Sequence, residues 1–469
     1  MGIPEADAEG GGALPLEGVL EGGGALARGV DSGANIGGGT NARLAIVGTY
    51  YRQSSAASSN VLGMVVDVPA IGSKGAEFGA NSASLAPQSM ERFDAPPSPM
   101  TPFEGSREGE VGSEAAPLDP AYTGSVSDEL AIALYEQMVL ARELDQRLVA
   151  LQREGRIVSH STAVGEEAAI VGAAAALRDE DWVFLAAREM AAALWRGMPL
   201  AACAHHVFGT ARSAGKGRNV HGSPFWKPTR VASASPLSGT HIPHAVGVAW
   251  AARMRREDVA ALVFFGEGAT SSGDFHTGLN FAGVTKAPVL AVCRNNGWAT
   301  STPASRQTAS EGFAVKALAY GMRGVGVDGG DVMAVLGVVR EARARASKGE
   351  GGTLIEAVTT PLHEADGGDG TDRAGAPDTT WPRRDPIARM RRHLEAKGLV
   401  NAESDERLVA EVRADVDRAL AEASGAALPG AGAWFDDVYA SLPWHLREQR
   451  DEANTAQPGA SAIAAEEPS

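Results

Sequence analysis

Between about residues 155 and 360, short apolar segments alternate with alanine-rich segments of helical character. Parallel strands that are joined by helices form sheets covered on both faces, and such strands are apolar almost throughout. The alternation therefore predicts an α/β fold, with a mostly parallel sheet and helices on both faces. The predicted strands are residues 182–187, 259–265, 287–293, 324–329 and 353–359, and the predicted helices are 165–177, 273–284, 312–321 and 331–347.

The segments on either side of this region have a different composition. Residues 1–117 are dominated by Gly, Ala, Ser and Pro and hold too little apolar surface to offset the entropy of ordering. They are predicted to form a low-complexity, mostly disordered extension. Ser127 is expected to cap a helix that ends near Gly155. The other predicted divisions are an α/β domain over 118–365, an acidic Gly-rich loop over 366–380, a helical segment over 381–445 with helices at 385–398 and 403–425, and a disordered tail over 446–469.

Charge and composition exclude several classes of protein. The chain has 469 residues and a formal net charge of −16, so it lacks the basic character that binding to nucleic acid or to an anionic membrane requires. No stretch approaches 18 uncharged apolar residues, and the acidic N-terminal segment resembles neither a secretory signal nor an Arg-rich transit peptide. Cys203 and Cys293 lie in apolar surroundings, which favours buried, reduced thiols. A cytoplasmic location is expected.

Oxygen-bearing side chains follow two of the predicted strands at the point where each strand ends. Glu267 comes just after residues 259–265, and Asn295 and Asn296 come just after residues 287–293. If the two strands are neighbours, these side chains meet at one edge of the sheet, where open parallel sheets bind ligands. A carboxylate, an amide oxygen and a backbone carbonyl near Trp298 would form an oxygen-only set that suits Mg²⁺ beside a phosphate.

The surrounding residues agree with a phosphate site but do not require one. Gly266, Gly268 and Gly273 allow close approach to the backbone, a helix beginning near Gly273 would present N–H groups, and Arg294 adds a positive charge. The alternative is an ordinary turn that uses Gly and Asn for their tolerance of unusual dihedral angles. Ser271 stands where a dinucleotide-binding G-x-G-x-x-G motif would have its third glycine, so that motif is absent.

The combination of G-E-G at 266–268, a spacer of residues 269–294 and N-N at 295–296 resembles the thiamine diphosphate motif, whose usual form begins with G-D-G. Further segments, among them 165–177, 235–253, 301–310 and 316–335, are similar to the alpha subunit of the thiamine diphosphate-dependent 2-oxoacid dehydrogenases, of the pyruvate and branched-chain types. The resemblance covers about residues 118 to 400.

The resemblance implies a role for particular residues. Glu267 and Asn296 would bind Mg²⁺ through their side chains and Trp298 through its carbonyl. The remaining implied cofactor contacts are the backbone of Gly266, Gly268 and Ala269 and the side chains of Arg188 and Arg294 at the diphosphate, and the backbone of Ser235 and Leu237 at the aminopyrimidine. It also implies a beta subunit in an α2β2 assembly, a small 2-oxo acid as substrate, and a lipoyl-bearing acyltransferase as acceptor.

The chain departs from the family pattern at positions that handle substrate. Ala187 stands where the family has Tyr, and Ala365 stands where an ungapped match places a catalytic histidine. His363 lies two residues away and is the candidate catalytic residue if the loop is shifted. Asp366 takes the place of a regulatory serine, and His241 replaces a Gln that helps to hold a monovalent cation. Two alternatives therefore stay open: a non-catalytic paralogue that binds the cofactor or the beta subunit, and an acetoin-cleaving relative.

Other motifs are weaker. Residues 367–372 resemble one calcium-binding repeat, but such repeats function as stacks, so an acidic loop is the favoured interpretation. The pairs His205 with His206 and His241 with His244 lack a carboxylate or thiol at a matching spacing, and ordinary helix histidines are expected.

Overall fold

The computed structural model describes residues 116–216, 218, 224–232, 237–360 and 384–456. Its centre is a six-stranded sheet in the order β2-β1-β3-β4-β8-β7, in which all neighbouring strands are parallel. The predicted α/β fold class is thereby confirmed. The strands are β1 Trp182–Phe184, β2 Val231–Ala232, β3 Ala261–Gly266, β4 Val289–Asn295, β7 Arg323–Asp328 and β8 Thr353–Val358.

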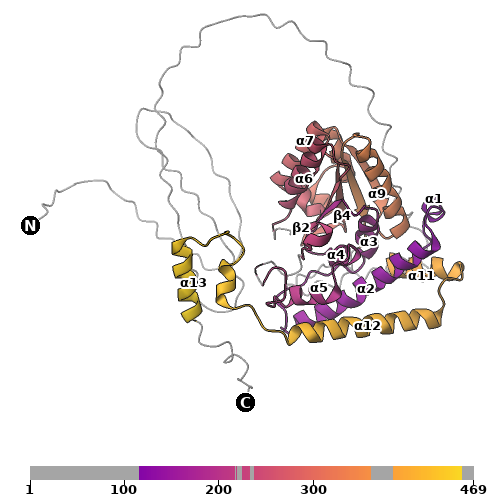
Figure 1. The fold of residues 1–469 in the computed structure, drawn as a ribbon. Helices are drawn as coiled ribbons and strands as arrows, with labels where there is room; N and C mark the ends of the chain where they lie inside the picture. The colour runs from indigo at the N-terminus through magenta and orange to yellow at the C-terminus, as the bar shows by residue number, and fades with distance from the viewer. Residues whose placement is uncertain (1–115, 217, 219–223, 233–236, 361–383, 457–469) are drawn as a thin grey trace, which may run out of the picture. The chain divides into compact units, whose positions relative to one another are not determined.

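Alternate side chains of the central strands enter two separate hydrophobic clusters. Leu262 and Phe264 of β3 point into one cluster, whereas Val263 and Phe265 point into the other, as the two-residue period of a strand requires. α6 (His241–Arg255) and α7 (Gly273–Thr285) lie together against one face, and α9 (Val332–Ser347) lies against the opposite face (Figure 1). Both faces are therefore covered, which explains why the strands are apolar throughout.

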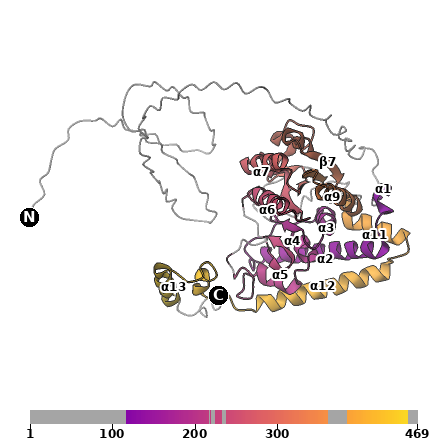
Figure 2. The same cartoon turned by 45° about the horizontal axis from the view of Figure 1, so that its top comes forward.

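A layer of helices lies beyond the α9 face of the sheet. The N-terminal helix α2 (Asp128–Arg153) begins at Ser127, whose side chain accepts the N–H of Leu130, and so the predicted cap is confirmed. Helix α2 packs against α12, and Figure 2 shows the two running side by side. The helices of this layer are α2, α3 Glu167–Ala175, α4 Met190–Trp195, α5 Leu200–Val207, α11 Pro386–Ala396 and α12 Ala402–Ser424.

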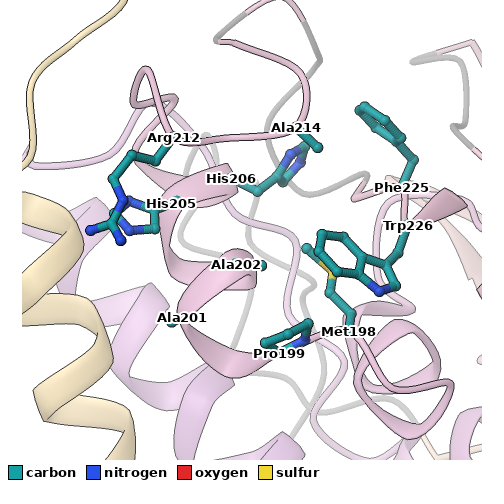
Figure 3. A pocket seen from close by; sticks show the side chains of 10 residues that line it. All are labelled: Met198, Pro199, Ala201, Ala202, His205, His206, Arg212, Ala214, Phe225 and Trp226. Atoms are coloured by element: carbon teal, nitrogen blue, oxygen red, sulfur yellow. The ribbon is translucent and has the colours of Figure 1, made fainter. Parts of the chain in front are cut away.

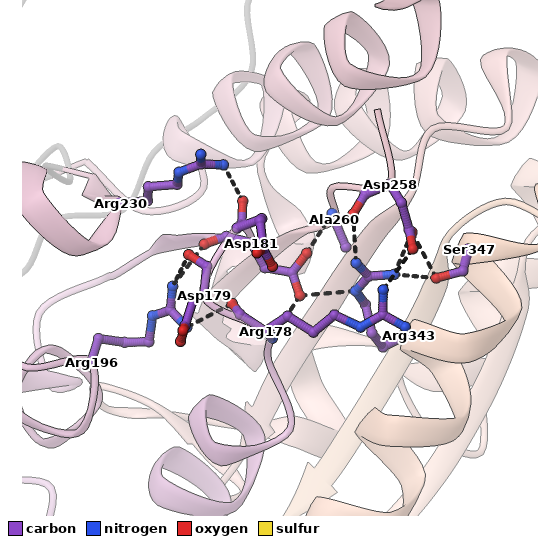
Figure 4. Close-up of polar contacts among 10 residues, drawn as sticks. Arg178, Asp179, Asp181, Arg196, Arg230, Asp258, Ala260, Arg343 and Ser347 are labelled. Carbon is purple, nitrogen blue, oxygen red and sulfur yellow. Dashed lines mark hydrogen bonds and ion pairs between the residues drawn. The ribbon is translucent and has the colours of Figure 1, made fainter. Parts of the chain in front are cut away.

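Buried charges close the amino ends of β1 and β3 (Figure 4). Asp181 is fully buried; its side chain accepts the N–H of Ala260 at 2.8 Å and pairs with Arg343 of α9 at 2.8 Å. Arg196 donates to the carbonyls of Asp179 and Asp181 at 3.0 Å each. The buried carboxylate of Asp181 has several hydrogen-bond donors around it, so its hydrogen-bonding capacity is satisfied. The network therefore fixes the amino ends of β1 and β3, which are the opposite ends from those that lead to Glu267 and Asn296.

The structure differs from the sequence predictions in several elements. Residues 314–320 form a 3₁₀ helix, η3 (Ala314–Tyr320), in place of an α-helix. Its backbone lies close to β7, since a Cβ on Gly324 would lie 2.1 Å from the carbonyl oxygen of Ala314. Helices α4, α5 and α6 were not among the predicted elements. The segment predicted as a disordered tail from residue 446 is helical up to residue 456, because it belongs to α13 (Trp444–Ala456).

The remaining elements are short, and some predicted regions lie outside the described residues. The short elements are α1 Pro120–Thr123, η1 Lys227–Thr229, η2 Glu267–Ser271, β5 Trp298–Ala299, β6 Thr302–Pro303, α8 Ala304–Gln307 and η4 Ala431–Phe435. The extension up to residue 115 and the whole loop predicted at 366–380, with its repeat-like residues 367–372, lie outside the described residues. Cys203 and Cys293 are buried thiols, as expected. Within the described part of the chain, no helix has the length and apolar character needed to cross a bilayer.

Candidate cofactor site at the strand ends

The two predicted clusters of oxygen-bearing residues meet at one edge of the sheet. β3 and β4 are hydrogen-bonded neighbours, and the last residue of β3, Gly266, is in register with Arg294. Glu267 therefore leaves β3 at the level where Asn295 ends β4. The adjacency that the sequence analysis assumed is confirmed.

Glu267 is a buried carboxylate with an incomplete set of partners. Glu267 is only 2% exposed, and Oε1 of its carboxylate has no hydrogen-bond partner among the described residues. Burial raises the pKa of Glu267 to about 7, and the negative charge of Glu166 acts in the same direction. An unpartnered buried carboxylate oxygen is costly unless a cation or a proton compensates for it.

Asn296 lies in a tight turn directly opposite this end of β3. Its Oδ1 accepts the N–H of Trp298 at 3.1 Å, and its Nδ2 donates to Oε1 of Glu166 at 2.9 Å. Gly297 has a φ of +84°, which favours glycine, and its N–H donates to Oδ1 of Asn295 at 2.9 Å. The turn leads into the hairpin of β5 and β6, so Asn296 and Trp298 are fixed together.

Gly268 allows the β5–β6 hairpin to lie against the end of β3. A Cβ at Gly268 would stand 2.6 Å from the Cβ of Ala299 and 4.0 Å from Oε1 of Gln307. At Gly266 and Gly273, in contrast, nothing lies within 4 Å of such a Cβ. Space next to the backbone therefore exists on one side of Glu267, and close packing exists on the other.

The arginines of the site are bound by carboxylates that the sequence analysis did not identify. Arg294 is 4% exposed and forms ion pairs with Glu166 and Glu189. Arg188 pairs with Glu166 at 3.3 Å, and its side chain is 25% exposed. Burial alone would raise the pKa of Glu166, but attraction to Arg294 and Arg188 outweighs burial and lowers it. The charge of Arg294 is thus balanced within the protein, whereas Arg188 is the more accessible cation.

The other predicted site residues are placed as follows. Leu237 precedes α6 and is 66% exposed, while Ser235, His363 and Ala365 lie outside the described residues. Ala187 is exposed next to Arg188. His241 is buried at the start of α6, and its Nε2 lies 2.6 Å from the carbonyl oxygen of Phe264. Burial lowers the pKa of His241, so a neutral imidazole joins α6 to β3.

A cavity of about 320 Å³ lies apart from these residues, between α5 and the Phe225–Trp226 segment (Figure 3). The ring of His205 in its wall bonds to the hydroxyl of Thr210 at 3.0 Å, and burial lowers its pKa. None of the described residues that line the cavity is a carboxylate. In the part of the chain that the structure describes, no group of three or more His, Cys, Asp or Glu side chains is arranged to hold a metal. The oxygen atoms at the ends of β3 and β4 are therefore the candidate donors for a metal ion.

Comparison with known proteins identifies the family. The family model described as "Dehydrogenase E1 component" matches residues 135–431. The alpha subunit of 2-oxoisovalerate dehydrogenase from Bacillus subtilis is 39% identical over 319 residues, a match that covers 67% of this chain and 97% of that protein. The alpha subunit of the pyruvate dehydrogenase E1 component from Staphylococcus aureus is 36% identical over 329 residues, covering 69% and 86%. The mitochondrial 2-oxoisovalerate dehydrogenase subunit alpha 2 of Arabidopsis thaliana is 38% identical over 327 residues, covering 69% of each chain. With its parallel sheet and its strand-end oxygen cluster, the chain belongs to the dehydrogenase E1 component family, alongside relatives that are alpha subunits of 2-oxoacid dehydrogenases.

Proposed function

We propose that the chain is the alpha subunit of a 2-oxoacid dehydrogenase decarboxylating component, which acts with thiamine diphosphate and Mg²⁺ on a small 2-oxo acid and passes the acyl product to a lipoyl-bearing acyltransferase. The observation that carries this proposal is the buried Glu267 with its unpartnered oxygen, at the end of a strand that lies beside the one leading into the Asn296 turn. A hard divalent cation would satisfy this oxygen, and oxygen donors are the ligands that Mg²⁺ prefers.

The residues present fit the proposed cofactor. Glu267 and Asn296 would hold Mg²⁺ by their side chains and Trp298 by its carbonyl, while the backbone of Gly268 and Ala269 would contact the diphosphate. Arg188 is the accessible positive charge for the same group. Arg294 acts indirectly: it binds Glu166, and Glu166 in turn fixes the amide of Asn296. When bound, thiamine diphosphate supplies the electron sink for decarboxylation, and the protein supplies position and polarity.

A beta subunit is the second part of the proposal. An exposed apolar patch on α6 and α7 supports an assembly: Met254 is 71% exposed, Val284 is 77% exposed, and the rings of Trp250 and Phe281 lie 6.4 Å apart. Contiguous exposed apolar side chains mark interaction surfaces in soluble proteins. An α2β2 arrangement would cover this patch and complete the cofactor site from the other chain.

The test is turnover of the assembled enzyme. The chain would be co-expressed with a beta subunit, supplied with Mg²⁺ and thiamine diphosphate, and assayed for reduction of an artificial electron acceptor with a panel of 2-oxo acids. We expect reduction that depends on both a 2-oxo acid and the cofactor. Cofactor-independent background alone, with a correctly assembled complex, would contradict the proposal.

A non-catalytic paralogue is the second candidate, and Ala187 is the observation that favours it. Its exposed methyl group leaves the surface next to Arg188 without the aromatic side chain that the family resemblance implies. Ala187→Tyr distinguishes the catalytic alpha subunit from the non-catalytic paralogue. If the native chain is catalytically silent, Ala187→Tyr together with Ala365→His should raise turnover from background; robust native turnover would exclude this candidate.

A further inference from the structure

Two of the three proposed Mg²⁺ ligands, Asn296 and Trp298, lie on one loop whose two ends meet at a single side chain. Residues 296–312 connect β4 to η3 and carry Asn296 and Trp298, together with Gln307, which lies near Glu267. Glu356 lies in the middle of the adjacent strand β8, in register with Cys293 of β4. It is 7% exposed and was not among the residues that the sequence analysis selected.

The carboxylate of Glu356 binds both ends of this loop. Oε1 accepts from Nδ2 of Asn295 at 2.7 Å, directly before the loop. Oε2 accepts the backbone N–H of Phe313 at 2.8 Å and of Ala314 at 2.7 Å, directly after it. The fit is close, because a Cβ at Gly312 would lie 2.9 Å from Oε2. A single buried carboxylate thus accepts three donors from two segments.

Asn295 transmits this contact to the metal-binding turn. Its Oδ1 accepts the N–H of Gly297 at 2.9 Å, and its backbone oxygen accepts the N–H of Thr359 at 2.8 Å. With Nδ2 engaged by Glu356, the amide has only one orientation in which Oδ1 faces Gly297. The turn that presents Asn296 and Trp298 is therefore oriented through Asn295 by the charge on Glu356.

We infer that Glu356 is a positioning residue for cofactor binding: it closes the 296–312 loop at both ends and holds Asn296 and Trp298 opposite Glu267. This inference rests on the proposed function of the strand-end site. Groups that orient the direct ligands of a metal typically change metal affinity by about 10- to 100-fold when they are removed. Glu356 is expected to lie in that range although it does not contact the metal itself.

The hydrogen-bond pattern provides a test by exchange of partners. In Glu356→Gln, the amide oxygen still accepts from Phe313 and Ala314, but the amide NH₂ then faces Nδ2 of Asn295, so two donors oppose each other. Asn295→Asp added to Glu356→Gln replaces that donor by an acceptor. The double variant restores every hydrogen bond of the native pair, including the bond to Gly297, and keeps the net charge.

The experiment measures the Mg²⁺-dependent affinity for thiamine diphosphate, by calorimetry on the full-length chain assembled with its beta subunit. We expect Glu356→Gln to weaken binding by about 10- to 100-fold and the double variant to return to within about threefold of the native affinity, in the manner of a double-mutant cycle. Asp181→Asn is the matched control, because Asp181 is an equally buried carboxylate at the opposite strand ends; it should lower stability and leave this affinity unchanged.

The outcomes separate this inference from the proposed function. Native protein that does not bind thiamine diphosphate with Mg²⁺ would overturn the proposed function, and this inference with it. Native binding with an unchanged affinity in Glu356→Gln would overturn this inference alone. If Glu356→Gln does not fold, the double variant decides: native-like affinity supports the positioning role, and a folded double variant with strongly reduced affinity contradicts it.

Discussion

The sequence suggests that Arg294 binds the cofactor diphosphate, but in the structure its charge is paired with carboxylates of the protein itself. It is buried between Glu166 and Glu189, and Glu189 is fully buried. Removing one member of a buried ion cluster leaves uncompensated charge and typically costs about 3–5 kcal/mol. We expect Arg294→Met to lower the free energy of unfolding by about that amount without any cofactor present.

Urea unfolding of Arg294→Met and Arg188→Met compares how much each replacement lowers the free energy of unfolding. Arg188 is more exposed, so its replacement should cost clearly less. A smaller loss for Arg294→Met than for Arg188→Met would show that Arg294 is not the structural cation of the site.

Glu267 predicts a particular dependence of stability on pH. Burial raises its pKa from 4.5 to about 7 in the folded chain, so folding takes up a proton between these values. The contribution of Glu267 to the free energy of unfolding is therefore complete below pH 4.5 and falls by about 1.4 kcal/mol per pH unit as the pH rises to about 7.

Unfolding curves of the native chain and of Glu267→Gln between pH 5 and pH 8 isolate this effect. The free energy of unfolding of the native chain should fall relative to that of Glu267→Gln as the pH rises. Mg²⁺ with thiamine diphosphate should offset this loss at high pH. Parallel curves would contradict the assignment of Glu267 as the titrating group.

The candidate site was predicted from sequence only where its residues directly follow a recognisable apolar strand. Glu267 and Asn296 follow directly from apolar segments, so their meeting at one edge could be expected from two strands. Glu166 and Glu189 reach the same place from other segments, and Glu356 comes from a third strand. Nothing local distinguishes these carboxylates from surface glutamates, so their roles depend on tertiary contacts that a single sequence does not display.

At the scale of elements, α7 and η3 are packed with almost no space between their backbones. A Cβ at Gly283 would lie 1.8 Å from the carbonyl oxygen of Tyr320, whereas one at Gly273 in the first turn of α7 would meet nothing within 4 Å. We expect Gly283→Ala to destabilise the protein by about 2–3 kcal/mol or more through overpacking. Gly273→Ala is the control and should be neutral or stabilise by up to about 1 kcal/mol. Thermal unfolding of the two variants checks this, and equal midpoints would contradict the packing described.

The elements that were predicted correctly share a physical cause. β3 and β4 are buried on both faces, so their apolar residues run continuously and mark the strands to within about two residues. β2, β5 and β6 have two residues each and exist only because a partner strand is present. For η3, helical spacing predicted the region correctly, but the close approach to β7 and the acceptor provided by Glu356 selected the tighter helix.

At the scale of the whole molecule, the hydrophobic core ends on α12. Ala423 is the last buried residue of the described chain, and the segment from 431 to 456 contributes exposed ion pairs such as Lys216 with Asp437 at 2.7 Å. Exposed pairs are worth at most about 1 kcal/mol. A chain that stops after residue 430 should therefore keep its unfolding midpoint. A large drop in the midpoint would show that this segment is part of the core unit.

A calorimetric titration of thiamine diphosphate with and without Mg²⁺ tests most directly whether the oxygen cluster at the ends of β3 and β4 binds the cofactor. The native chain, assembled with the proposed beta subunit, should bind the cofactor only when Mg²⁺ is present. Glu267→Gln should lower the affinity by at least about 100-fold, since even outer partners of a metal site cost 10- to 100-fold. Binding by the native chain that needs no Mg²⁺, or that is unchanged in Glu267→Gln, would place the cofactor elsewhere and contradict the account.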